Sequence, residues 1–204
     1  MFSKVSVSRV LSVLLAVLLL SGSAIGVTPA HASTFTVTNL NDSGAGSLRQ
    51  AVMDANAAAG ADTIIFASSL GTDTITLAAM LPIITDDAGL TIDGDNRIAL
   101  SGNDNVQVLS VSAGALLTLQ NISVTHGNAT SGGGGLYNEG TVTIIHSAFS
   151  NNSATGSRGG GVANVGGTAA ITNSAFSNNS ATADGGGVFN DGTLTIANSA
   201  FSIE

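Results

Sequence analysis

The stretch that decides the fold is a threefold repeat in the second half of the chain. Residues 133–155 read GGGLYNEGTVTIIHSAFSNNSAT, residues 159–182 read GGGVANVGGTAAITNSAFSNNSAT, and residues 185–202 read GGGVFNDGTLTIANSAFS. The glycine triplets begin 26 residues apart. A unit this short cannot bury its apolar side chains alone, so we expect the copies to stack on one another as a solenoid.

Each copy carries apolar residues two positions apart, as in Val-x-Ile and Leu-x-Ile, which is the period of a β-strand and not of a helix. The same phase extends back to residues 111–130. A leucine-rich horseshoe would need a helix-forming arc in every copy, and the Gly-, Ser- and Asn-rich arcs disfavour one. We therefore predict stacked parallel strands about 4.8 Å apart. The predicted core stack consists of Ile144, Ile171, Ile196, Phe149, Phe176 and Phe201.

Two polar columns accompany the apolar ones. The first comprises Asn138, Asn164 and Asn190, and the second comprises Asn121, Asn173 and Asn198, with His146 in the remaining position. Asn tolerates a left-handed backbone and bonds readily to its neighbours, so these columns predict structural ladders at the corners of the coils. His146 is interpreted as a substitute for a ladder Asn, not as a catalytic base.

Composition excludes several classes of protein. Charged residues make up 9% of the chain and hydrophobic residues 44%, which is the opposite of the disorder signature. There is no Cys, so disulfide scaffolds, cysteine-ligated zinc and thiol chemistry are excluded. Beyond residue 32 the chain keeps three Arg and no Lys against 13 acidic residues. Nucleic acid and anionic membrane surfaces are therefore not expected as partners.

Residues 1–32 predict a Sec-type signal peptide. Lys4 and Arg9 precede the apolar run 10–20, and a small-x-small site predicts cleavage after Ala32. The alternative is an uncleaved membrane anchor over residues 10–27, although polar and Gly residues interrupt it. We expect export to the cell surface or outer membrane, or secretion, and no membrane span in the mature chain.

Residues 33–89 are predicted to cap the first coil with strands and one short helix. Ser47 and Gln50 have the spacing of a capping box, and Gly60 could close the helix. The apolar face of this helix is predicted to be Leu48, Ala51, Val52 and Ala55. Residues 90–204 are predicted to form coils of 25–27 residues, the last one incomplete. The chain is then either a fragment of a larger surface protein or self-associates through that end.

The glycine and Phe motifs resemble a known family. GGGLYN, GGGVAN and GGGVFN, each followed by Ser-Ala-Phe, resemble the paired repeats of polymorphic outer-membrane proteins and related right-handed parallel β-helix surface proteins. Their Phe-x-x-Asn element matches residues 149–152 and 176–179. Residues 46–51, GSLRQA, are similar to the CSLREA-type segment of bacterial exported proteins, with Gly46 in place of Cys and Gln50 in place of Glu. The resemblance implies an all-β, right-handed, pectin-lyase-like solenoid at the cell surface.

The only dense acidic cluster is the candidate metal site. Asp93, Asp95 and Asp104 could bind calcium through carboxylate oxygens, although Arg97 occupies a position that an EF-hand would give to a ligand. The alternative is turn chemistry, because Asp-Gly and Asp-Asn pairs favour corners. No catalytic residue is identified, and no cofactor is expected other than calcium at this cluster.

We interpret the chain as a non-enzymatic adhesin or passenger-type binding or structural module. Its partner would be an extracellular protein or a glycan surface. One alternative is a β-helix polysaccharide lyase or hydrolase, with or without a requirement for calcium, because that chemistry also occurs on this fold. The other alternative is a truncated fragment with no activity of its own.

Overall fold

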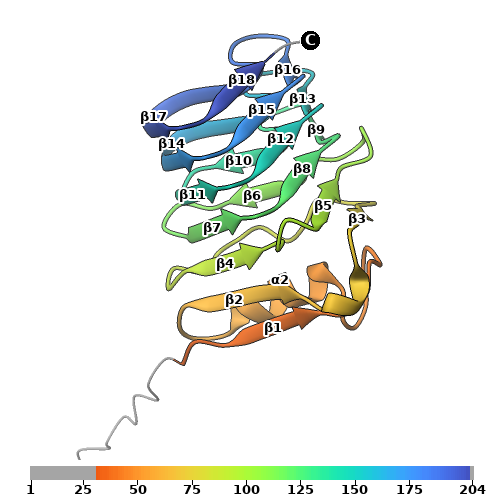
Figure 1. The fold of residues 1–204 in the computed structure, drawn as a ribbon. Helices are drawn as coiled ribbons and strands as arrows, with labels where there is room; N and C mark the ends of the chain where they lie inside the picture. Colours follow the sequence, from red (N-terminus) through yellow and green to blue (C-terminus); the bar gives the residue numbers. More distant parts are fainter. Residues whose placement is uncertain (1–30, 203–204) are drawn as a thin grey trace, which may run out of the picture.

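Parallel strands dominate the structure. The computed structural model describes residues 31–202, which form a β-solenoid of about six turns (Figure 1). Each coil lies on the coil before it, and its strands pair in parallel with their equivalents in that coil. The expected fold class is confirmed. Residues 1–30, which hold most of the predicted signal peptide, lie outside the described residues. Within residues 31–202, no helix has the length and apolar character needed to cross a membrane.

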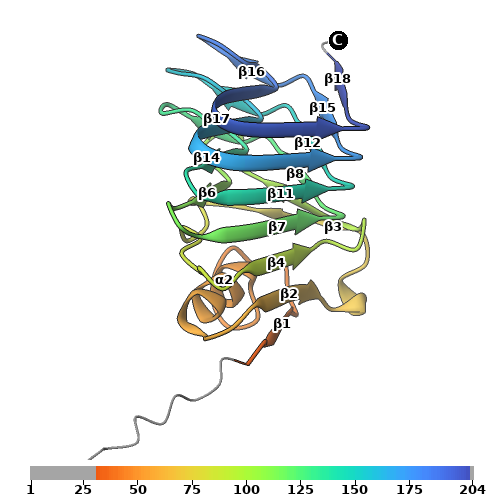
Figure 2. The ribbon, with the colours of Figure 1, turned by 90° about the vertical axis from the view of Figure 1, so that its left-hand side faces the viewer.

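The largest sheet has nine strands and follows the solenoid axis (Figure 2). Its strands are β1 (Thr34–Val37), β2 (Asp62–Phe66), β4 (Leu90–Asp93), β6 (Leu109–Val111), β7 (Leu116–Gln120), β10 (Leu136–Asn138), β11 (Thr141–Ile145), β14 (Val162–Thr172) and β17 (Val188–Ala197). Strand β14 pairs with both β10 and β11, so it joins two runs of strands that are separate in the earlier coils. Strands β1 and β2 of the predicted cap therefore belong to the same sheet as the repeated coils.

A six-stranded sheet and a three-stranded sheet form the other faces of the solenoid. The six strands are β3 (Asp73–Thr76), β5 (Ile98–Ser101), β8 (Ser123–Thr125), β12 (Ala148–Ser150), β15 (Ala175–Ser177) and β18 (Ala200–Ser202). The three strands are β9 (Asn128–Ala129), β13 (Ser153–Ala154) and β16 (Ser180–Ala181). Phe149 pairs with Phe176, and Phe176 with Phe201, so the alignment of the repeats is also the register of the strands.

The core consists of apolar side chains that alternate along each strand and stack between coils. Ile144 and Ile171 are fully buried, and so is Phe149. The Phe149 and Phe176 rings stack with centroids 5.1 Å apart, and Phe176 and Phe201 stack at 4.8 Å. Burial of one such side chain contributes about 1.5–3 kcal/mol, so the stacked columns supply much of the driving force for coiling.

Two residues predicted for the core are largely exposed. Ile196 and Phe201 have exposed fractions of 42% and 48%. Both lie in the last described coil, where one face of each side chain has no further coil against it within residues 31–202. Their positions in the columns are as predicted, but their predicted burial is wrong. A side chain in a solenoid is buried only when a coil lies on each side of it. Its place in a column follows from the repeat alignment alone.

The predicted helix is present as α2 (Leu48–Ala57) and packs against β1 and β2 at the first coil (Figure 1). Its buried face is the predicted one: Leu48, Ala51, Val52 and Ala55. The Ser47 hydroxyl accepts a hydrogen bond from the backbone N–H of Gln50 at 3.2 Å, which satisfies one free donor of the first turn. A short 3₁₀ turn, η1 (Ser68–Leu70), follows strand β2.

Two details of the helix prediction are wrong. The side chain of Gln50 donates to Asp54 Oδ1 at 2.7 Å, so the capping box is not reciprocal. The helix ends with Ala58 as its C-cap, in an extended conformation, and Gly60 does not close it. An i,i+4 bond on the exposed helix surface competes with the longer reach back to the cap.

The three glycines of a triplet serve different purposes. Gly159 has φ +69°, a left-handed corner that favours glycine. A Cβ on Gly160 would overlap the carbonyl oxygen of Ser180, and a Cβ on Gly161 would lie 2.5 Å from the carbonyl oxygen of Gly187. The first glycine of the triplet therefore forms a corner. The other two allow the backbones of successive coils to approach each other.

Candidate functional site

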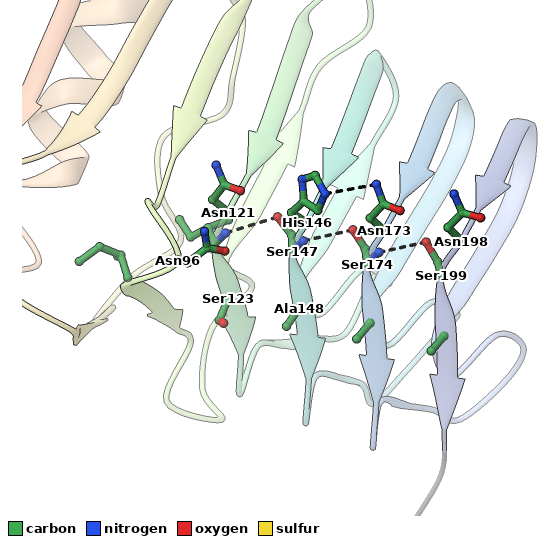
Figure 3. Close-up of a pocket in the computed structure, with 14 residues that line it drawn as sticks. Asn96, Asn121, Ser123, His146, Ser147, Ala148, Asn173, Ser174, Asn198 and Ser199 are labelled. Carbon is green, nitrogen blue, oxygen red and sulfur yellow. Dashed lines mark hydrogen bonds between the residues drawn. The ribbon is translucent and has the colours of Figure 1, made fainter.

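The candidate site is a groove of about 790 Å³ along one corner of the solenoid (Figure 3). It runs from coil to coil, between the ends of β7, β11, β14 and β17 and the starts of β8, β12, β15 and β18. Its rim carries the column Asn96, Asn121, His146, Asn173 and Asn198, and its floor carries Ser147, Ser174 and Ser199. The groove therefore repeats the same polar chemistry once per coil.

The rim residues mark a left-handed corner. The φ angles of Asn121, His146, Asn173 and Asn198 lie between 47° and 53°. Asn is enriched in this conformation because its short amide can bond locally, and His is also enriched there. The Nδ2 atom of Asn173 lies 3.2 Å from Nε2 of His146, so His146 occupies its place in the column as a hydrogen-bonding partner, as Figure 3 shows.

The floor is a ladder of Ser hydroxyls that the sequence reasoning did not single out. The hydroxyl of Ser174 donates to the carbonyl oxygen of Thr172 at 2.9 Å and accepts from the N–H of Ser147 at 3.2 Å. Ser199 repeats the arrangement, accepting from the N–H of Ser174 at 3.1 Å. The signal was present in the repeated Ser-Ala-Phe, where Ser stands directly after the corner residue. The floor is thus internally bonded. On the rim, Asn173 is bonded to His146 and Asn121 donates to Asp93, so the remaining polar atoms of the rim side chains are the ones that can meet a partner.

The column Asn138, Asn164 and Asn190 is a ladder inside the solenoid. Asn138 Nδ2 donates to Asn164 Oδ1 at 2.7 Å, and Asn164 Nδ2 donates to Asn190 Oδ1 at 2.6 Å. Both Asn138 and Asn164 are fully buried. At the lower end, Asn138 Oδ1 has no hydrogen-bond partner among the described residues, because Val111 occupies the column in the preceding coil. Its side chains bond to one another along the solenoid, so this ladder has a structural role.

The Asn of the Phe-x-x-Asn element forms a second buried ladder. Asn152 Oδ1 accepts from the N–H of Gly127 at 2.8 Å. Its Nδ2 donates to the carbonyl oxygen of Val124 and to Oδ1 of Asn179, both at 3.0 Å. Buried main-chain groups at a sharp corner need partners, and this side chain provides them. The Phe-x-x-Asn motif is therefore explained by the hydrogen bonds that its Asn side chain makes to buried main-chain groups of the neighbouring coil.

The acidic cluster splits between two corners. Asp93 and Asp95 precede strand β5, and Asp104 follows it, so about 13 Å of strand lies between them. Within residues 31–202, no group of three or more His, Asp or Glu side chains is placed to hold a metal ion. The structure thus does not gather the three proposed calcium ligands at one point. Calcium binding at these residues is tested below.

Each carboxylate of the first corner already has protein partners. Asp93 accepts from Asn121 Nδ2 at 3.0 Å, from Gln120 Nε2 at 2.8 Å and from the N–H of Asp95 at 2.9 Å. Burial alone would raise the pKa of Asp93, but these three hydrogen bonds together lower it. Asp95 forms an ion pair with Arg97 at 2.8 Å. This corner is organised by its own side chains.

The stacked coils and their ladders of corner Asn define the chain as a parallel β-helix. In comparison with known families, residues 173–191 match the Chlamydia polymorphic membrane protein repeat. The matched segment spans strand β15, the Asn179 ladder position and the last glycine triplet. The match and the solenoid together fit a β-helix protein of the polymorphic membrane protein type. The chain has no significant match among curated proteins.

Proposed function

We propose that this chain is an exported surface β-helix that binds an extended segment of an extracellular protein along the groove, without catalysis. The match to a polymorphic membrane protein repeat supports the surface location. Export through residues 1–32 remains a prediction from the sequence. The adhesin-like role is supported by the chemistry of the groove and by its length.

The observation that carries the proposal is the repetition of neutral amides on the groove rim. The rim column places one polar side chain per coil from Asn96 to Asn198, a span of about 19 Å at the parallel interstrand spacing. An extended peptide of about six residues covers that distance. Side-chain amides offer both donor and acceptor, so they complement the alternating N–H and C=O groups of such a peptide.

The side chains of the groove also favour a binding role over a catalytic one, and a protein ligand over a carbohydrate ligand. Among its described lining residues there is no Asp, Glu, Lys or Arg, and no Phe or Tyr. His146 is the only titratable side chain in that set, and its ring faces Asn173. General acid–base catalysis needs a paired donor and acceptor near the substrate. Sugar rings are usually held against aromatic faces, which this lining lacks.

The test measures binding of the purified protein to an array of overlapping peptides from extracellular-matrix proteins, with neutral glycans on the same surface. The triple variant Asn121→Gly/Asn173→Gly/Asn198→Gly removes three of the four rim amides and keeps the left-handed corner. We expect its affinity for the bound peptides to fall at least tenfold, about 1.4 kcal/mol. No release of reducing ends from the glycans is expected.

A matched control uses the same change at another corner. Asn103 and Asn151 have φ angles of 53° and 54° and do not line the groove. The variant Asn103→Gly/Asn151→Gly should bind as the parent does. Equal binding by the groove variant and the parent, or no peptide binding above background by the parent, would refute the proposal. Glycan binding that the groove variant loses and the control variant keeps would assign the groove to a different class of partner.

A further inference from the structure

A second site lies on the outer face of the largest sheet, where two aromatic rings stand in one column. Tyr137 pairs with Ala163, and Ala163 with Phe189, so the three residues occupy the same position in successive coils. In the core, the Phe149 and Phe176 rings of adjacent coils stack 5.1 Å apart, which shows that one coil step accommodates one ring. The outer column has a ring, then a methyl group, then a ring.

The missing ring leaves a small pocket. Two coil steps separate Tyr137 from Phe189, which is about 9.6 Å at the parallel spacing. Ala163 is 1% exposed and forms the floor, and Ser131 and Ser157 contribute to the lining. The volume is about 220 Å³. Pockets for drug-sized ligands begin near 300 Å³, so this one suits a single ring.

Polar groups stand at the edge of this pocket. The guanidinium of Arg158 lies over the Phe189 ring, 5.0 Å from its centroid, and its Nε pairs with Asp184 Oδ2 at 3.0 Å. That contact orients the remaining N–H donors of Arg158. Asp191 lines the same pocket and supplies carboxylate acceptors. An aromatic face with one donor group and one acceptor group beside it is suited to an uncharged ligand with neighbouring hydroxyls.

The charges around the pocket further restrict the kind of ligand that it can bind. Arg158 is balanced by Asp184, and the carboxylates of Asp191 and Glu139 remain near the opening. Burial raises the pKa of Tyr137, and the adjacent Glu139 raises it further, so its phenol stays neutral. An anionic ligand would meet excess negative charge. A cationic ligand would compete with Arg158, which already lies on the Phe189 ring.

We infer that the pocket between Tyr137 and Phe189 binds one pyranose ring of a neutral glycan. The C–H face of the sugar packs against the Tyr137 ring. Arg158, held on the Phe189 ring, donates to one hydroxyl oxygen of the sugar, and Asp191 accepts from a neighbouring hydroxyl. This site shares no lining residue with the groove, so it does not depend on the function proposed for that groove. It gives the surface a second kind of contact.

The experiment is saturation-transfer NMR on the purified protein with the methyl glycosides of glucose, galactose, mannose and N-acetylglucosamine, and of glucuronic acid. We expect at least one neutral sugar to bind with a dissociation constant on the order of millimolar, the range for a ligand with few atoms. The charged glucuronide should bind more weakly than glucose. Phe189→Leu and Arg158→Ala should each weaken binding of the neutral sugar at least tenfold.

The control is Ser110→Ala, which changes the same outward column one coil outside the pocket and should leave binding unaltered. Arg158 is 51% exposed, so its truncation should leave the melting temperature close to that of the parent and separates loss of binding from loss of folding. No transfer from any neutral sugar would overturn the inference. Preference for the glucuronide, or binding that survives both variants, would do the same.

Discussion

Replacement of Asn152 by Ala tests whether buried ladders hold the coils together. The side chain makes three hydrogen bonds inside the solenoid, to Gly127, Val124 and Asn179, at 2.8–3.0 Å. Each contributes about 1 kcal/mol, and leaving the N–H of Gly127 without a partner adds about 1–3 kcal/mol. We expect Asn152→Ala to lower the free energy of unfolding by about 4 kcal/mol, a large part of the about 5–15 kcal/mol typical of a domain.

The assay is urea unfolding followed by far-ultraviolet circular dichroism, because the chain has no Trp to report by fluorescence. A lower midpoint with an unchanged slope would show a loss of stability alone. The control is Asn151→Gly, which changes the exposed neighbour at φ 54° and should cost little. A loss below about 1 kcal/mol for Asn152→Ala, or a loss equal to that of the control, would refute the reasoning.

A companion variant, Asn152→Asp, should lose stability in a way that depends on pH. An ionised carboxylate there would face the carbonyl oxygen of Val124 and the amide oxygen of Asn179, both of which repel it. Its pKa in the folded state should therefore rise above the unfolded value of about 3.9. The native state then binds more protons, so the deficit relative to the parent should shrink as the pH falls from 7 towards 4. A deficit independent of pH would contradict this.

Four further predictions concern other parts of the molecule. Phe176→Ala should destabilise the protein by about 3–5 kcal/mol in urea unfolding, because its ring is 2% exposed and lies between two other rings. Phe201 is 48% exposed, so Phe201→Ala should cost less than half of that. Equal costs would argue against the stacking of coils as the source of this stability. Gly160→Ala should destabilise by at least about 1–3 kcal/mol because its Cβ would overlap the next coil, whereas Gly166→Asn, with φ +70° and open space, should be tolerated. The lowered pKa of Asp93 means that its carboxylate stabilises the fold above about pH 4. Asp93→Asn should therefore lower the melting temperature at pH 7, and this difference from the parent should vanish as the pH falls below about 4. Calcium should leave the melting temperature unchanged, because Asp93 and Asp95 already have partners; a saturable rise that Asp93→Asn/Asp95→Asn abolishes would establish the predicted site instead.

Much of the candidate site could be predicted because a solenoid converts sequence period into spatial contact. The alignment that places Asn121, His146 and Asn173 in one column also places them on one groove rim. The Ser ladder of the floor was equally visible in the repeated Ser-Ala-Phe but was not interpreted. The pairing of Tyr137 with Phe189 across Ala163 follows from the same alignment, and only the structure adds the Arg158 contact.

The sequence by itself determined the strands, their parallel register, the capping helix and the identity of the stacked columns. These features are local or periodic, and a period of 25–27 residues with matching motifs leaves one way to place each copy on the next. Tertiary structure decided what depends on separation in three dimensions. It placed Asp104 at the other end of a strand from Asp93, exposed Phe201, and showed which glycines are corners and which are contacts. Sequence spacing cannot supply these features, because the burial of a side chain and the distance between two side chains depend on which atoms lie beside them in space. The order of residues along the chain does not fix those neighbours.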